Sequence, residues 1–324
     1  DTVSISGTSF SAPTVAGVAA LILEANPTLG YRDIQEILAY SSQNPTSSNS
    51  GWQTNGTDNW NGGGLTVHDG YGFGMVDAHA AVRLAETWSD QSTASNLSSV
   101  AASRAPGTAI VDNSTIYDSL SIGSNLLVDF IEVDLNISHT WIGDLTVNLT
   151  SPDGTTSTLV NRPGVYAQSQ WGTGQDDINF TFSSVQQWGE VGSGTWTLAV
   201  TDDYAADPGI LNSWSLRLYG DIIDNDDTYI YTDEWDRHGG EAGRDTIVDA
   251  TGTDTLNFAA ITNDLTLDLM PGASSSLNFI PFTIDASTVI ENVFGGDGDD
   301  AITGNDANNT LEGMRGNDVL FGGL

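Results

Sequence analysis

Ser9 lies in the stretch GTSFSAP (7–13), directly before a strongly apolar run, VAGVAALILEA (15–25). The run predicts a helix, and because its apolar residues fall on all sides we expect that helix to be buried. Pro13 suits a first helical turn, where its missing N–H costs nothing. Ser9 is then expected at or just before a buried helix N-terminus, where free N–H groups and the helix dipole could stabilise an oxyanion. The simpler interpretation is that Ser9 or Ser11 only caps the helix.

A second group of candidate residues lies in three consecutive nonapeptides, GGDGDDAIT (295–303), GNDANNTLE (304–312) and GMRGNDVLF (313–321). Each begins with glycine, carries Asp or Asn at its sixth position and has an apolar residue at its eighth. Glycine-rich nonapeptides of this form are calcium-binding repeats. Glycine turns leave carbonyl oxygens available and the Asp adds a charged oxygen, which suits the hard Ca²⁺ ion.

The spacing of the repeats predicts how these oxygens meet. We expect one coil of the tail to take two nonapeptides, so that each repeat stacks on the second repeat along. Asp300 and Asp318 share the sixth position and would then face each other across one Ca²⁺. The carbonyls of three glycines would complete much of the coordination shell: Gly296, Gly298 and Gly316.

Charge narrows the possible partners. The chain has 43 acidic residues against eight arginines and no lysine, giving a formal net charge of −35. Nucleic acid and anionic membrane surfaces are therefore disfavoured as partners. The acidity has two possible causes, binding of divalent cations or adaptation to a saline habitat. The 21 acidic residues in positions 221–324 favour calcium because part of them recur with the nonapeptide period.

Hydrophobicity and cysteine content say less about the class of protein. No stretch reaches the roughly 18 apolar residues that span a bilayer, so no membrane span is expected. The chain has no cysteine, which leaves its redox compartment open.

Periodicity divides the chain into zones. Residues 1–90 show helical patterning, with helices expected near 31–38 and 76–88, and the Ser-rich stretch 91–104 is expected to be a linker. Apolar residues then alternate with polar ones, which predicts an antiparallel β-sandwich over residues 105–221. Its clearest strands are expected at 131–137, 145–149, 178–182, 196–200 and 214–218. A β-rich segment at 222–294 precedes the repeats at 295–324, which break off within a fourth copy.

Several longer stretches resemble known families. GTSFSAP with its helix, LEANPTLGYRDIQEIL (23–38) and HDGYGFGMVDAHAAV (68–82) resemble the subtilisin-like serine peptidases of the kexin and furin branch. The resemblance implies that residues 1–90 are the C-terminal part of an α/β peptidase domain and that Ser9 attacks the scissile carbonyl.

The later zones resemble domains found beside such peptidases. SHTWIGDLTVNLTSPDGTTSTLV, WGEVGSGTWTLAVTD and GILNSWSLRLYG resemble the P domain, which in this branch packs on the peptidase domain. Trp141 and Ile142 stand where that family often has basic residues before Gly-Asp. The tail is similar to the repeats-in-toxin β-roll of secreted bacterial peptidases, so the fold class expected is multidomain.

The resemblance implies a secreted, calcium-dependent serine endopeptidase that acts on a protein or peptide substrate. In this family the Asp and His of the catalytic triad precede the serine, so we expect them upstream and expect the chain as given to be an inactive fragment. Its four histidines follow Ser9 and match no base position: His68, His79, His139 and His238. The alternative is a non-catalytic calcium-binding surface or adhesion module. Cleavage specificity cannot be read from these residues.

Overall fold

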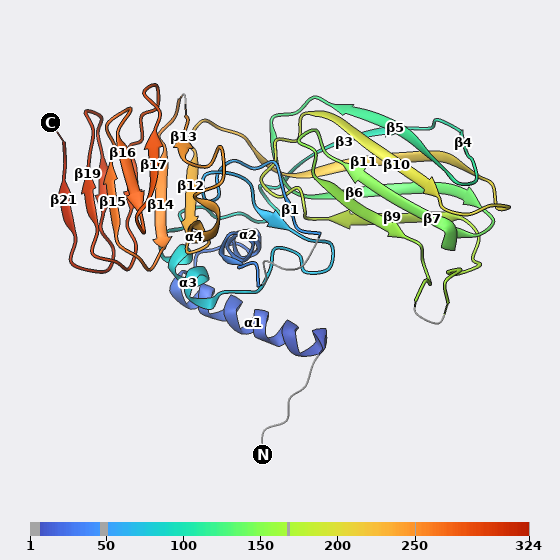
Figure 1. Ribbon diagram of the computed structural model, residues 1–324, viewed down its shortest axis with the longest axis horizontal. Coiled ribbons are helices and arrows are strands. Elements are labelled where there is room, and N and C mark those ends of the chain that lie inside the picture. The colour runs from blue at the N-terminus through green and yellow to red at the C-terminus, as the bar shows by residue number, and fades with distance from the viewer. Residues whose placement is uncertain (1–6, 46–50, 167–168, 250, 324) are drawn as a thin grey trace, which may run out of the picture.

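The chain is arranged as three parts along its long axis. The computed structural model describes residues 7–45, 51–166, 169–249 and 251–323. Figure 1 shows a helical part at the centre, the strands of residues 98–222 on one side of it, and the stacked strands that follow residue 228 on the other. The N-terminal helical part therefore lies between the antiparallel strands and the C-terminal strands.

The helical part is formed by α1 (Thr8–Ala25), α2 (Tyr31–Ser41) and α3 (Ala78–Thr87), with a small pair of strands, β1 (Gln53–Thr54) and β2 (Thr66–Val67). Asp77 starts α3, because its carboxylate accepts the N–H groups of His79 and Ala80. Gly30 precedes α2 and donates its N–H to the Asp33 carboxylate at 2.6 Å. The three helices share one buried core, which includes Ile22, Ile37, Tyr40, Trp60 and Leu84.

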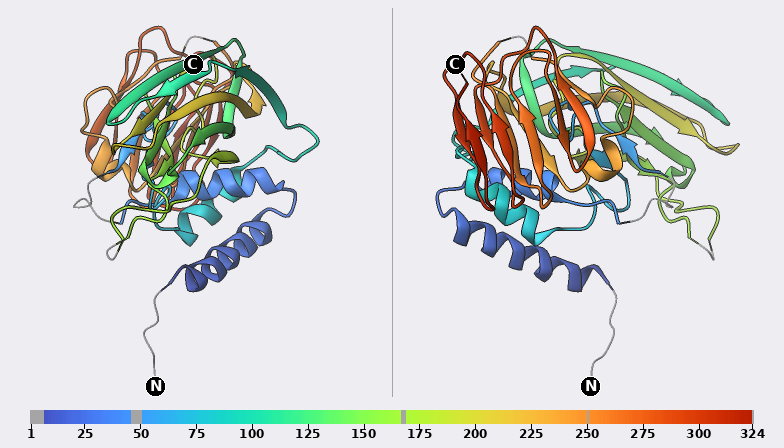
Figure 2. Two further views of the ribbon diagram at one scale, coloured as in Figure 1. Left: turned by 90° about the vertical axis from the view of Figure 1, so that its right-hand side faces the viewer. Right: turned by 60° about the vertical axis from the view of Figure 1, so that its left-hand side comes forward.

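Helix α1 differs from the expectation of a buried helix. It begins at Thr8, so Ser9 lies inside the first turn and Pro13 lies within the helix. Only Val18 and Ile22 are buried, whereas Leu21 is 46% exposed. The reason is visible in Figure 2, where α1 lies beside α3 on one side and extends away from the rest of the described chain. Its remaining apolar side contacts no other layer of the described residues.

The length and composition of α1 bear on the expectation that no membrane span is present. Among the described residues, Thr8–Ala25 is the one helix that is long and apolar enough, by length and composition, to cross a membrane. Core helices of soluble proteins and signal sequences meet the same criterion.

Residues 98–222 form two antiparallel sheets. One sheet has the strand order β5 (Ser114–Ile122), β10 (Gly194–Asp202), β7 (Leu145–Thr150) and β8 (Thr156–Asn161). The other has the order β3 (Ser98–Arg104), β11 (Gly209–Ile222), β6 (Leu126–His139) and β9 (Ile178–Ser184), with β4 (Thr108–Ile110) also paired to β11. Alternate residues of both sheets meet in one core around Trp196 and Trp214. The five strands expected from alternation are all present.

The linker expected at residues 91–104 is wrong in its second half. Strand β3 pairs with β11 along its whole length, from Trp214↔Arg104 to Gly220↔Ser98. Val100 and Ala102 pack against the core between the sheets. With only two apolar residues of this kind, the strand was too polar to stand out in the sequence.

The C-terminal part contains two sheets built mainly of parallel strands. One has the order β12 (Thr228–Thr232), β14 (Thr255–Ala260), β18 (Asn292–Phe294) and β20 (Thr310–Glu312). The other has the order β13 (Thr246–Ile247), β17 (Ile280–Ile284), β16 (Ser274–Leu277), β15 (Leu265–Asp268), β19 (Ala301–Thr303) and β21 (Val319–Phe321). The short helix α4 (Trp235–His238) follows β12.

The nonapeptides stack with the expected offset. Ala301 pairs with Val319, and Asn292 pairs with Thr310, so each repeat lies on the second repeat along. The parallel stacking begins earlier than the repeats, because β12 and β14 already pair in this way. One hydrophobic core runs from Tyr229 to Ile302. The segment at 222–294 is thus structurally continuous with the repeats that follow it.

Both outer parts contact the helical part through buried ion pairs. Arg32 on α2 is 2% exposed and lies 2.7 Å from Asp129 and 2.6 Å from Asp221, which belong to the antiparallel sheets. Arg83 on α3 is 1% exposed and lies 2.7 Å from Asp297 in the first nonapeptide. These contacts link each outer part directly to a helix of the N-terminal segment.

Candidate catalytic serine and cation sites

Ser9 is exposed in the first turn of α1. Gly7 precedes the helix with a φ of 143°, a conformation that favours glycine. The first four N–H groups of a helix have no partner within it, so the N–H of Ser9 is directed outward from the helix end. Among the described residues, the position therefore combines an exposed hydroxyl with a backbone N–H that has no partner within the helix.

The four histidines have their partners elsewhere. His79 lies 2.9 Å from the Asp297 carboxylate and His238 lies 3.0 Å from Glu241. His139 is buried 3.2 Å from Asp202, and the ring of His68 packs against Trp52 and Tyr71. Within the described ranges no hydrogen bond or ion pair joins Ser9 to a histidine. The part of the chain that the structure describes thus supplies Ser9 with no general base.

Asp300 and Asp318 are brought together at one edge of the C-terminal stack. The N–H of Asp300 donates to Asp318 Oδ1 at 3.0 Å. Asp300 is 1% exposed, and its two carboxylate oxygens accept the N–H groups of Leu265 and Gly296. Asp264 lies on the same edge, one coil earlier, and accepts the N–H of Asp299. Successive coils therefore present carboxylates to one another along this edge.

Among the described residues, no cationic side chain forms an ion pair with the Asp300 carboxylate. Burial, with the charges of Asp318 and Asp264, raises the pKa of Asp300 to about 6, although its backbone hydrogen bonds oppose the shift. A Ca²⁺ ion, which takes about six to eight oxygen ligands, would relieve this repulsion.

The three glycines assigned to this site lie beside it in different ways. Gly316 has a φ of 112°, and a Cβ there would lie 1.9 Å from the carbonyl oxygen of Gly298. The carbonyl of Gly296 accepts the N–H of Arg315 at 3.1 Å. Gly298 and Gly316 are thus in close contact across the two coils, whereas one lone pair of Gly296 is already used.

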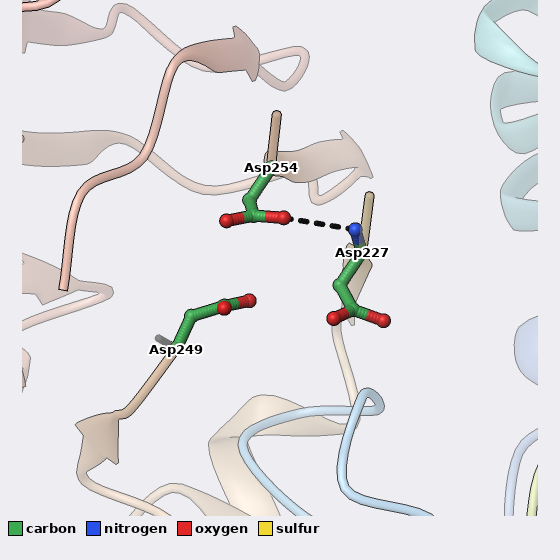
Figure 3. Close-up of side chains that lie close together, drawn as sticks. All are labelled: Asp227, Asp249 and Asp254. Atoms are coloured by element: carbon green, nitrogen blue, oxygen red, sulfur yellow. Dashed lines mark hydrogen bonds between the residues drawn. The ribbon is translucent and has the colours of Figure 1, made fainter. Parts of the chain in front are cut away.

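A second carboxylate group, which sequence reasoning missed, lies upstream of the repeats. Asp227, Asp249 and Asp254 place carboxylate oxygens within 4.8 Å of one another (Figure 3). The N–H of Asp227 donates to Asp254 Oδ1 at 2.9 Å, and the N–H of Asp254 donates to Glu291 Oε2 at 2.8 Å. The Tyr229 hydroxyl donates to Asp249 at 2.8 Å.

Burial and mutual repulsion act on this group as they act on Asp300. Desolvation and the charge of Asp249 raise the pKa values of both Asp227 and Asp254 to about 6. The two hydrogen bonds join residues that are far apart in the sequence, by 27 positions from Asp227 to Asp254 and by 37 from Asp254 to Glu291. No short sequence period could therefore have revealed this group. The signal that remains is an acid directly before each of the successive parallel strands β12, β14 and β18.

The acidic turn after β10 does not gather its carboxylates. Asp202 faces His139, Asp203 accepts the Thr146 hydroxyl, and Asp207 accepts the Thr140 hydroxyl. These three carboxylates each engage a different partner, so among the described residues they form an acidic turn and not a metal-binding loop.

Three family matches divide the chain as the fold does. Residues 1–74 match the subtilase family, residues 128–218 match the proprotein convertase P-domain, and residues 294–324 match the RTX calcium-binding nonapeptide repeat. The chain thus carries a subtilisin-like serine peptidase segment, a convertase P domain and repeats that bind calcium.

Relatives of the chain include kexin- and furin-like convertases. The chain is 36% identical to "Proprotein convertase subtilisin/kexin type 5" of Homo sapiens over 67% of its own length and 12% of that protein. It is 36% identical to "Proprotein convertase subtilisin/kexin type 6" of Rattus norvegicus, over 66% of this chain and 23% of that one. A solved serine protease of Aeromonas sobria is 26% identical with a TM-score of 0.54, covering 67% of this chain and 44% of that chain. The chain therefore spans less than half of the length of each of these relatives.

Proposed function

We propose that this chain is the C-terminal portion of a secreted, calcium-dependent serine endopeptidase in which Ser9 is the nucleophile. The observation that carries the proposal is the place of Ser9, exposed in the first turn of α1 within the segment that matches the subtilase family. Its own N–H would be one donor to the oxyanion that forms on the scissile carbonyl. The substrate class is a protein or peptide.

The general base would come from residues outside this chain. A serine hydroxyl is a weak nucleophile until a neighbouring base accepts its proton, and the four histidines are engaged elsewhere. The exposed apolar side of α1 fits the same proposal, because the rest of a peptidase domain would cover it. The chain as given would then be inactive.

The first prediction is that a fluorophosphonate probe labels the 324-residue chain no more than its Ser9→Ala variant. A longer protein that includes the preceding peptidase residues should be labelled and should hydrolyse peptides, and Ser9→Ala should abolish both. Labelling is read by intact mass. Stoichiometric labelling of Ser9 in the short chain would contradict the missing base, whereas a longer protein that remains inert would favour the non-catalytic calcium-binding module.

We propose further that the two antiparallel sheets are a β-sandwich that supports the peptidase segment, and that the C-terminal stack is a calcium-binding β-roll. The shared core of the sheets and the Arg32 contact to Asp129 support the first assignment. The 18-residue register and the uncompensated Asp300 support the second. Asp300 and Asp318 would hold one Ca²⁺ with carbonyls of Gly298 and Gly316, and Gly296 in a weaker role. The bound ion would supply the positive charge that this edge lacks.

The second prediction is that Asp318→Ala lowers the calcium affinity of the full chain at least tenfold, which corresponds to about 1.4 kcal/mol. The variant removes one of two facing carboxylates, and the binding energy is also folding energy. Asp306→Ala is the matched control, because Asp306 is an exposed acid of the same tail and should change affinity little. Calorimetric titration measures both. Equal affinity of Asp318→Ala and the parent would refute the pairing.

A further inference from the structure

A hollow at one end of the antiparallel sheets is lined by aromatic rings and carboxylates. It has a volume of about 440 Å³ and is formed by Trp141, Asp144, Trp171, Tyr204, Ala205 and Asp207. These residues come from the start of the 3-10 turn at Ile142–Asp144, from the loop after β8 and from the loop after β10. The hollow lies within the size range of sites for small ligands.

The aromatic wall is fixed in place by its own contacts. Trp141 donates its Nε1–H to the carbonyl of Trp171 at 2.7 Å. The rings of Trp171 and Tyr204 meet edge to face with centroids 5.5 Å apart. Trp171 is nevertheless 57% exposed. An indole ring that is exposed to water in a fixed orientation is an unfavourable apolar surface, and its open face can contact a ligand.

Asp144 is the feature that points to a ligand. Its side chain is 4% exposed and lines the hollow. In the described part of the chain, no hydrogen bond or ion pair engages its carboxylate, although buried carboxylates are normally paired. Burial, with the charges of Asp202 and Asp207, raises its pKa. Asp207 accepts one hydroxyl, from Thr140, and adds a second negative charge to the same hollow.

The nearby cation, Arg162, compensates these carboxylates only in part, because its charge opposes the rise in the pKa of Asp144 without cancelling it. Arg162 directs its guanidinium to the carbonyls of Gly143 and Gln170 and stacks on the Tyr204 ring at 4.4 Å. It forms no ion pair with Asp144 or Asp207 among the described residues. Since the chain has no lysine, its own side chains leave this hollow with unmatched negative charge.

We propose that this hollow binds the cationic side chain of an arginine or lysine in a peptide. The aromatic rings would hold the cation and its aliphatic stem by cation–π and apolar contacts, and Asp144 would receive a charge-assisted hydrogen bond. A sugar could stack on the rings but would leave the carboxylate charges unbalanced. A metal ion would meet the carboxylates but would not use the three rings.

The test titrates the full chain, at saturating calcium, with the peptide acetyl-Ala-Arg-Ala-amide and with its citrulline counterpart, which replaces the guanidinium by a neutral group of the same shape. We expect saturable binding of the arginine peptide by calorimetry and by tryptophan fluorescence, and at least tenfold weaker binding of the citrulline peptide. Asp144→Asn and Trp171→Ala should each lower affinity for the arginine peptide at least tenfold. Trp171 is exposed, so its variant should fold normally, which the thermal melt verifies.

Two controls separate this site from general charge and aromatic content. Tyr117→Ala removes a ring that is 70% exposed on β5, and Asp306→Asn removes one exposed tail carboxylate. Both should bind the arginine peptide as the parent does. Equal binding of the two peptides would overturn the proposal, as would equal losses in the control variants. Binding of methyl glucoside or of additional calcium that depends on Asp144, without binding of the arginine peptide, would overturn it too.

Discussion

Buried carboxylates are the most unusual residues of the C-terminal part. Asp254 and Asp300 are each 1% exposed, and their pKa values, like that of Asp227, are raised to about 6. Without a cation, each of these groups is more easily protonated in the folded chain than in the unfolded chain, where an aspartate has a pKa near 3.9. Their ionisation at neutral pH therefore opposes folding unless a cation compensates it.

The third prediction follows from the sign of these shifts. In the absence of calcium, the folded state binds more protons than the unfolded state between about pH 4 and 6, so its stability should fall as pH rises through this window. The stabilisation by added calcium should grow over the same window, because the ion binds the deprotonated carboxylates. Thermal melts with chelator and with calcium, at a series of pH values, measure both trends.

Asp300→Asn serves as the control for that prediction, because an amide cannot ionise. Its melting temperature without calcium should depend less on pH than that of the parent, and its response to calcium should be smaller. A calcium-free parent whose stability rises steadily from pH 4 to 6 would show that other groups govern this part.

The contact between α3 and the first nonapeptide joins two elements that are far apart in the sequence. Arg83 is buried against Asp297 and also contacts Glu86. The exposed Arg315 reaches both of these carboxylates, and His79 reaches Asp297. Two buried atoms of the Arg83 guanidinium make no hydrogen bond in the described residues, so the ion pair with Asp297 is their main compensation. Breaking such a buried pair leaves an uncompensated charge.

The fourth prediction is that Arg83→Ala destabilises the chain by about 3–5 kcal/mol, as observed for broken buried pairs. Arg315→Ala removes a cation of the same cluster that is 54% exposed, and it should cost less than about 1 kcal/mol. Urea unfolding of both variants gives the two free energies. Costs of similar size would indicate that the cluster is a surface network in which Arg83 has no special part.

The register of the repeats could be predicted from the sequence because its period is short. The 18-residue spacing of Asp300 and Asp318 is the offset between β19 and β21. The earlier coils could not be predicted, since an antiparallel pair, β16 and β17, interrupts them and varies their length. The Arg83 contact could not be predicted either, because it joins residues 214 positions apart with no shared pattern.

At the scale of the whole molecule, the antiparallel sheets form a unit with a core of their own. That core contains 22 buried residues, all from positions 110–218. Sequence alternation predicted it well because each strand buries one face. The same reasoning missed β3. It also predicted that α1 is buried, because apolar patterning shows which side of a helix is suited to burial but not which segment covers that side.

The fifth prediction is that residues 98–222 fold alone, with near-ultraviolet circular dichroism and a cooperative melt that calcium hardly changes. A shorter version, residues 105–222, lacks β3 and should be less stable by about 2 kcal/mol or more, because the core loses the side chains of Val100 and Ala102 and the edge of β11 is uncovered. Equal stability of the two versions would show that residues 98–104 contribute no more to the unit than a linker would.

The turn at residues 295–300 serves two neighbours at once. Asp297 points to α3 from one side of it, and Asp300 points to the carboxylate edge from the other. A cation that fixes this short turn also fixes the partner of Arg83, so ion concentration and the order of α3 become linked variables. Thermodynamic linkage is reciprocal, so a well-ordered peptidase segment would in turn raise the affinity of the tail for its ion. The ion concentration that half-saturates the tail would then depend on the peptidase segment to which the tail is attached.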